Sequence, residues 1–240
     1  MIVGAFMNWT RNRSIKGFCG AVFLVVSLLI IGCGGNQGER DLKTNLRIIN
    51  GLSEIEPIDI LIDGRLSFEK MRYLESTGYF SIASGSRDIR AVASGSLTAV
   101  AQSTASLSDD RDQTFLVYGS RQNPRGTIIL DDADEPPSGT VKLRAIGVTA
   151  KLNSVDLYLI PPNSSVDDFP PTIRGVQLGG SSDYILGLPG TYSLWLTDQG
   201  TKDLKAFIPN TVFKEKGLYT LLIAETKNES NPFTVVRIEG

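Results

Sequence analysis

Apolar and polar residues alternate along short stretches of the chain after about residue 45, which is the pattern of strands that bury one face. Isoleucines occupy every second position of residues 58–62, and large aliphatic residues repeat this spacing in residues 155–159. Turn signals such as Asp63-Gly64 separate these stretches. The pattern predicts an all-β fold of antiparallel sandwiches. The mild helix candidates are Ser67–Leu74 and a short turn near Lys202–Leu204.

The chain contains two copies of one β unit. Three blocks keep their order, namely residues 46–62 with 143–159 at an offset of 97, residues 79–86 with 184–191 at 105, and residues 114–117 with 220–223 at 106. The offset grows by eight where the second copy carries a proline-rich loop near residues 161–171. Insertions confined to a loop are typical of a tandem duplication.

The duplication defines the expected domains. They are a lipoprotein signal peptide at 1–32, a lipidated tether at 33–45, a first β-sandwich at 46–130, a linker at 131–139 and a second β-sandwich at 140–240. The linker is charged and rich in proline without apolar periodicity, so we expect it to be solvated. Each sandwich should hold about seven strands, like an immunoglobulin-like or transthyretin-like module.

Strand register fixes which side chains face inward, because a slip of one residue would turn the whole apolar face to water. We expect Ile48, Ile58, Ile60, Ile62, Ile82 and Leu116 to face inward in the first copy, and Ile146, Val155, Leu157, Leu159, Leu194 and Leu222 in the second.

The first 32 residues have the parts of an export signal. Three basic residues precede an uncharged apolar run at 18–31, which is shorter than the ~20 residues of a membrane-spanning helix. The run ends in Ile30-Ile31-Gly32-Cys33, which resembles the lipobox read by prolipoprotein transferase and signal peptidase II. We expect Ile30, Ile31 and Gly32 to be recognised by the peptidase and Cys33 to be lipidated. An ordinary membrane anchor or a plain secretory signal are the alternatives.

Lipidation at Cys33 would place the chain in the cell envelope, held to a membrane through its lipid anchor. Several acyl chains hold a protein firmly, at about 0.8 kcal/mol per buried CH₂. The next residue is Gly34 and not aspartate, and it begins a polar, glycine-rich tether. In a diderm source this favours the outer membrane, with the protein facing the periplasm or the surface.

Charge and composition exclude several function classes. Beyond residue 32 the formal charge is −5, against −2 for the whole chain, so the exported part lacks the basic character of a nucleic-acid binder. The sequence has no histidine, the commonest general base and metal ligand. Its two cysteines are Cys19 and Cys33, and cleavage before Cys33 would leave no pair for an intrachain disulfide.

Carboxylates are the first candidates for chemistry. The runs Asp109–Asp112 and Asp131–Glu135 could offer oxygen ligands to calcium, but neither has the spacing of a calcium loop, which favours solvated turn and linker positions. Asp59 and Asp156 could be a glycosidase pair. They occupy equivalent positions of the two copies, however, so we expect each to bond neighbouring backbone or side chains.

Hydroxyl and aromatic residues give weaker signals. The serine-rich runs contain no G-x-S-x-G turn and no S-x-x-K motif, and there is no P-loop. Tyr184, Tyr192, Trp195 and Tyr219 could form a platform on which a sugar stacks, or they could pack within a sheet. Strand spacing favours packing.

The opening of the first copy resembles domain-of-unknown-function family 4397. Members typically start with a strand, a turn and then Pro-x-Val-Asp-Val-Tyr-Val-Asp-Gly, and residues 57–64 read Pro-Ile-Asp-Ile-Leu-Ile-Asp-Gly. Tyr79, followed by Ser84-Gly85-Ser86, is similar to a later turn of the family. The resemblance covers residues 46 to about 120 well and the second copy loosely. Gly51-Leu52 departs from the usual Ala-Ser. The family implies an exported β-sandwich and offers no catalytic residues to transfer.

The sequence therefore predicts a membrane-anchored, non-catalytic module for binding, adhesion or envelope structure. Its partner would be an unknown protein or glycan, and we expect no cofactor and no metal. The alternative is an envelope hydrolase of glycosidase type with an unconventional carboxylate site.

Overall fold

The computed structural model describes residues 42–55, 57–131 and 134–240. Within these residues the fold consists of β-strands and one short 3-10 helix, η1 (Val166–Asp168). The prediction of an all-β fold with two sandwiches is confirmed. The signal peptide, the lipobox with Cys33 and residues 33–41 of the predicted tether lie outside the described residues, whereas residues 43–45 already belong to the first strand of the fold.

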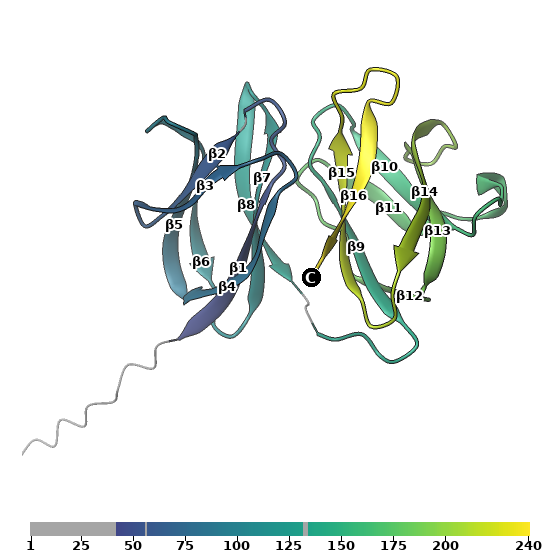
Figure 1. The fold of residues 1–240 in the computed structure, drawn as a ribbon, viewed down its shortest axis with the longest axis horizontal. Coiled ribbons are helices and arrows are strands. Elements are labelled where there is room, and N and C mark those ends of the chain that lie inside the picture. Colours follow the sequence, from purple (N-terminus) through teal and green to yellow (C-terminus); the bar gives the residue numbers. More distant parts are fainter. Residues whose placement is uncertain (1–41, 56, 132–133) are drawn as a thin grey trace, which may run out of the picture. The chain divides into compact units, whose positions relative to one another are not determined.

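Each sandwich consists of two four-stranded sheets (Figure 1). The first has strand orders β4-β1-β7-β8 and β3-β2-β5-β6. Its strands are β1 (Lys43–Asn50), β2 (Ile58–Ile62), β3 (Arg65–Met71), β4 (Ser76–Ala83), β5 (Gly85–Ala93), β6 (Ala99–Leu107), β7 (Asp112–Ser120) and β8 (Asn123–Asp131).

The second sandwich repeats this arrangement with orders β12-β9-β15-β16 and β11-β10-β13-β14. Its strands are β9 (Val141–Gly147), β10 (Ser154–Ile160), β11 (Ile173–Gln177), β12 (Ile185–Gly187), β13 (Gly190–Asp198), β14 (Leu204–Phe213), β15 (Leu218–Glu225) and β16 (Phe233–Glu239). Each sandwich thus has eight strands and not about seven. Pairing is antiparallel except for β1 with β7 and β9 with β15, which are parallel.

The pairing registers of the two copies match. Leu46 lies opposite Gln113 in the first copy, and Leu143 lies opposite Tyr219 in the second, which are the same positions at offsets of 97 and 106. We call the sheets β3-β2-β5-β6 and β11-β10-β13-β14 the outer sheets. In them, the pairing of β2 with β5 and of β10 with β13 shows the same agreement at offsets of 97 and 105. Each of these ladders joins strands of one copy, as two tandem sandwiches require.

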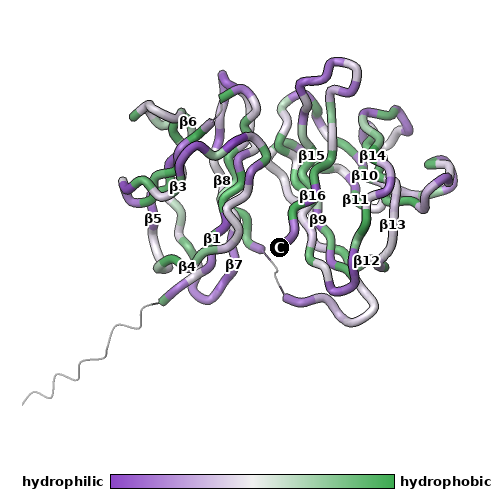
Figure 2. Tube along the Cα trace, viewed as in Figure 1, coloured by the Kyte–Doolittle hydropathy of each residue, from purple (hydrophilic) through white to green (hydrophobic). Residues whose placement is uncertain are grey.

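The sheets β4-β1-β7-β8 and β12-β9-β15-β16 are the inner sheets, and their central strands β1, β7, β9 and β15 are buried on both faces along most of their length. One face of each packs inside its own sandwich, and the other contributes to a third cluster shared by the copies, formed by Ile49, Leu116, Tyr118, Ile146, Val148, Leu222 and Ala224. The apolar character of these strands is visible in Figure 2. The expectation that each sandwich encloses its own share of these residues is wrong for Leu116, Ile146 and Leu222, which face the third cluster between the copies. Strands covered on both faces are apolar throughout, so alternation does not reveal which face is which.

The helix candidates are also wrong. Residues 67–71 belong to β3, which pairs with β2 in the outer sheet, and Leu204 begins β14. After β3 the chain turns through Leu74, whose φ of 64° no α-helix adopts. Pairing with a neighbouring strand outweighs the weak local preference for helix.

Gly51 explains one departure from the family pattern. A Cβ at this position would lie 2.7 Å from the Cβ of Val148 in the second sandwich, and 2.9 Å from the carbonyl oxygen of Val117. Gly51 and Val148 are equivalent positions of the two copies. The usual alanine therefore does not fit where the sandwiches meet.

Candidate functional site

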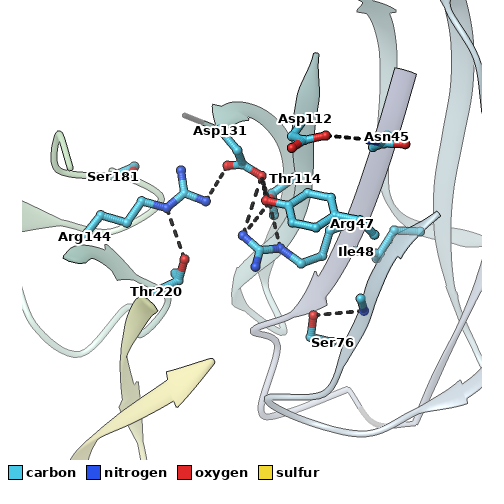
Figure 3. A network of polar contacts seen from close by, with 12 residues as sticks. Asn45, Arg47, Ile48, Ser76, Asp112, Thr114, Asp131, Arg144, Ser181 and Thr220 are labelled. Carbon is cyan, nitrogen blue, oxygen red and sulfur yellow. Dashed lines mark hydrogen bonds and ion pairs between the residues drawn. The ribbon is translucent and has the colours of Figure 1, made fainter. Parts of the chain in front are cut away.

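Two arginines and one aspartate form a buried cluster between the sandwiches, here called the Arg–Asp–Arg cluster (Figure 3). Arg47 lies on β1, Arg144 on β9 and Asp131 at the end of β8. Their side chains are 0–1% exposed. The expectation that Asp131 belongs to a solvated linker is therefore wrong. The sequence of a charged loop does not show whether its first carboxylate is solvated or paired with an arginine.

Each arginine is held in the same way by its own copy. Arg47 Nε donates to Thr114 Oγ1 at 3.1 Å, and Arg144 Nε donates to Thr220 Oγ1 at 3.2 Å. In both copies the threonine lies directly opposite the arginine on the parallel strand. The guanidinium carbons lie 4.6 and 4.8 Å from the ring centres of two equivalent tyrosines, Tyr79 and Tyr184.

Asp131 links the copies through both carboxylate oxygens. Oδ1 accepts a bond from Arg144 Nη2. Oδ2 lies 3.5 Å from Arg47 Nη2 and accepts bonds from Thr114 Oγ1 at 2.5 Å and Tyr79 OH at 2.6 Å. Burial raises the pKa of Tyr79 above its usual range, so this hydroxyl keeps its proton and donates it to Asp131.

The cluster has one carboxylate for two guanidinium groups. The residue that corresponds to Asp131 in the second copy is Gly240, whose N–H donates to Leu218 beside the end of β16. Arg47 Nη1 is buried and has no hydrogen-bond partner among the described residues. A signal for this cluster is present in the sequence, because both copies carry a Leu-Arg pair, at 46–47 and 143–144, inside otherwise apolar strands.

A second polar contact joins the sandwiches at the β1–β2 loop. The Glu225 carboxylate of β15 accepts a bond from Ser53 Oγ and lies 2.7 Å from Lys151 Nζ. The Glu225 N–H donates to Tyr73 OH at 3.0 Å. The hydrogen bond and charge of Glu225 raise the pKa of Lys151. Together with the shared apolar cluster, these contacts hold the two sandwiches as one body.

Asp59 and Asp156 have structural roles in their own sandwiches, as expected. Asp59 Oδ1 accepts bonds from the Lys70 N–H at 2.7 Å and Ser94 Oγ at 2.5 Å. Asp156 accepts bonds from the N–H groups of Gly175 at 2.8 Å and Gly200 at 2.9 Å. Burial opposes ionisation of Asp59, but the hydrogen bonds outweigh it and lower its pKa.

The acidic runs do not converge on a metal site in the part of the chain that the structure describes. Asp109 and Asp110 are exposed in the turn between β6 and β7. Within residues 42–55, 57–131 and 134–240, no three histidine, cysteine or carboxylate side chains are grouped to hold a metal ion. The same ranges contain no helix of the length and apolarity needed to cross a membrane.

Of the four aromatic residues that could form a sugar platform, Trp195 takes a different place from the others. Tyr219 is buried in the second core, where its ring lies 5.1 Å from Phe213. Tyr192 packs against the same phenylalanine, and Tyr184 covers Arg144. Trp195, on the outer face of β13, lies 4.9 Å from Phe207 of β14.

The insertion of the second copy covers part of this outer face. Val166 and Phe169 of the loop pack against Tyr158, which pairs with Trp195 across β10 and β13. Lys202 Nζ donates to the carbonyl groups of Val166 at 2.6 Å and Phe169 at 2.8 Å, and it lies 4.2 Å from the ring centre of Tyr158. A cavity of about 690 Å³ beside the loop is lined by Tyr158, Phe169, Arg174, Gln199, Thr201 and Lys202, among others.

Beyond the loop, four apolar residues define what we call the apolar face, namely Trp195, Leu204, Phe207 and Val212. Leu204, Phe207 and Val212 follow β14 and are 49%, 47% and 45% exposed. Phe207 lies directly opposite Trp195, and Leu204 and Val212 pair with Thr197 and Thr191. Contiguous apolar side chains on an exposed surface are typical of interaction sites.

The first copy has polar or small residues at the same positions. By pairing register, Arg90 and Gln102 correspond to Trp195 and Phe207, and Ala99 and Ser106 correspond to Leu204 and Val212. Arg90 lies 2.5 Å from Asp88, which also accepts a bond from Gln102 at 2.8 Å. The apolar face is therefore a property of the second copy and not of the fold.

In comparisons with known proteins, one family model matches part of the chain. Residues 44–158 match the family described as "Domain of unknown function (DUF4397)", which confirms the predicted resemblance. The match runs from β1 into β10 and includes Arg47, Asp131 and Arg144. The chain has no significant match among curated proteins.

The solved structures that are similar include a carbohydrate-binding module of family CBM26 from Eubacterium rectale in complex with maltoheptaose. The identity is 10%, the match covers 81% of this chain and 97% of that chain, and the TM-score is 0.25. A TM-score this low supports no conclusion about a ligand.

Proposed function

We propose that this chain, which matches DUF4397 over residues 44–158, is an exported, lipid-anchored module that binds a partner without transforming it. The observation that carries the non-catalytic part is the use of its carboxylates. Asp59 and Asp156, which the sequence offered as a glycosidase pair, and Asp131, the first residue of one acidic run, all accept hydrogen bonds that hold the fold.

The hydrolase alternative loses its main candidates for the same reason. A glycosidase needs two carboxyl groups facing each other across a sugar, one of them free to give up a proton. Asp59 and Asp156 lie in different sandwiches, and each is tied to the backbone of its own loop or strand. No contact brings these two residues to one cavity.

The anchored part of the proposal rests on the lipobox at Ile30–Cys33. A tether that enters β1 at Lys43 would connect a membrane lipid to the first sandwich, while the apolar face lies on the second. Because the cluster and the shared core join the sandwiches, the face would be presented on a rigid body and not on a flexible arm.

Metabolic labelling with palmitate tests the anchor. In the native host we expect the wild-type chain to incorporate label and fractionate with membranes. Cys33→Ala should remove the label and leave an uncleaved or released form. The matched control is Cys19→Ala, which changes the other cysteine of the leader and should label normally. Equal labelling of the Cys33→Ala chain would contradict the proposal.

A further inference from the structure

The two copies provide an internal control for the apolar face. Arg90 pairs with Gln102 in the first copy as Trp195 pairs with Phe207 in the second, so the fold itself accepts a polar pair at this position. The large side chains of Leu204, Phe207 and Val212 on β14 leave about half of their apolar surface in water, which the fold does not require at these positions. Their presence points to a ligand that covers them.

Neighbouring charges indicate an uncharged ligand. Lys205 is paired with Asp198 at 2.6 Å beside the face, and Lys202 is committed to the insertion loop. The cavity next to the face carries both signs, with Arg174 near Asp167 and Asp168. Neither an anionic nor a cationic partner would gain a complementary field here.

The edge of the sheet argues against a peptide strand or a second copy as the occupant. β14 is an edge strand, which could pair with another chain. Pro209 removes one backbone donor from it, and Asn210 has a φ of 53° at the place where the register with β13 shifts. The ligand must therefore use the side-chain face and not the backbone edge.

A sugar chain has the matching chemistry. Equatorial pyranose rings have flat, apolar C–H faces and carry hydroxyl groups at their edges. Phe207 and Trp195 would contact the ring faces, and Gln199, Thr201 and Arg174 of the adjoining cavity could bond the hydroxyls.

We infer that the apolar face binds a neutral glycan, with Phe207 and Trp195 packed against its sugar rings. This inference rests on the proposed binding function and adds the site and the ligand class.

Tryptophan fluorescence can test it directly, because the chain holds two tryptophans, Trp9 and Trp195. The full chain carrying Trp9→Phe, purified in detergent, would be titrated with cellohexaose and chitohexaose, and with the charged hexamer of galacturonate. We expect saturable changes in Trp195 emission with at least one neutral hexamer and none with galacturonate.

Variants locate the binding. Phe207→Gln and Leu204→Ala install the residues of the first copy and keep Trp195, and each should weaken binding by about tenfold. Gln102→Ala, at the equivalent position of the first copy, should bind like wild type. Unchanged circular dichroism and melting would show that the variants fold.

Several results would overturn the inference. These are no response to either neutral hexamer, equal binding by Phe207→Gln and wild type, a response to galacturonate alone, or emission that changes with protein concentration because a second copy covers the face. None of them affects palmitate labelling at Cys33, so failure of the glycan assignment can be told from failure of the anchored module.

Discussion

Changing Asp131 to asparagine keeps the size of the side chain but removes the negative charge that two buried guanidinium groups share. Oδ2 could still accept from Thr114 and Tyr79, whereas the other position would present an N–H₂ group to Arg144. Because all three side chains are at most 1% exposed, water cannot replace the lost contact. Breaking such a buried pair costs about 3–5 kcal/mol. For a body of this size the melting temperature should fall by about 10 °C.

Urea unfolding followed by circular dichroism measures this loss. The matched control is Asp109→Asn, which changes an exposed aspartate and should alter the free energy of unfolding by less than about 0.5 kcal/mol. Replacing the whole cluster, as Arg47→Met, Arg144→Met and Asp131→Leu together, should be less destabilising than Asp131→Asn alone, because no unpaired buried charge remains. A loss below about 1 kcal/mol for Asp131→Asn would refute the reasoning.

Two further predictions concern the contact between the sandwiches and the outer sheets. Gly51→Ala should lower the free energy of unfolding by about 1–3 kcal/mol, because its Cβ would overlap Val148. In the same urea titration Gly187→Ala should have a milder effect, because its Cβ would make ordinary contacts, and equal effects would contradict the close approach at Gly51. Asp59 has a lowered pKa in the folded state, so its contribution to stability is present above its ordinary value of 3.8 and is lost as the pH falls through the folded value. Melting temperatures measured from pH 5 to pH 2 should therefore fall less steeply for Asp59→Asn than for wild type, and parallel curves would count against the hydrogen bonds assigned to Asp59.

Sequence pattern predicted the outer strands better than the inner ones. Residues 58–62 alternate because β2 has one face in the core, and Ile58, Ile60 and Ile62 are buried as expected. β7 and β15 are buried on both faces, so their apolar runs do not indicate which side chains point into the sandwich and which point out of it. Leu116 and Leu222 were for this reason assigned to the wrong core.

The candidate site was harder to predict, because both of its parts depend on contacts between distant segments. Asp131 stands at the start of a charged stretch that reads as a solvated linker, and its partners are 84 and 13 residues away at Arg47 and Arg144. Trp195 and Tyr219 are both aromatic residues at strand spacing, so the sequence pattern does not distinguish them. In the structure Trp195 lies on the outer face of its sheet and Tyr219 lies in the core. Comparing the two copies at matched strand registers distinguishes these two residues, and the registers are known only from the structure.

The central claim, a module that binds without chemistry, is tested most directly with polysaccharide purified from the cell envelope of the native host. Wild-type protein would be incubated with it, sedimented, and the supernatant analysed for new reducing ends. We predict co-sedimentation that is lost when Phe207→Gln and Trp195→Arg are combined, and no new reducing ends. Release of reducing ends that depends on Asp59 or Asp156, or equal sedimentation of wild type and the double variant, would contradict the account.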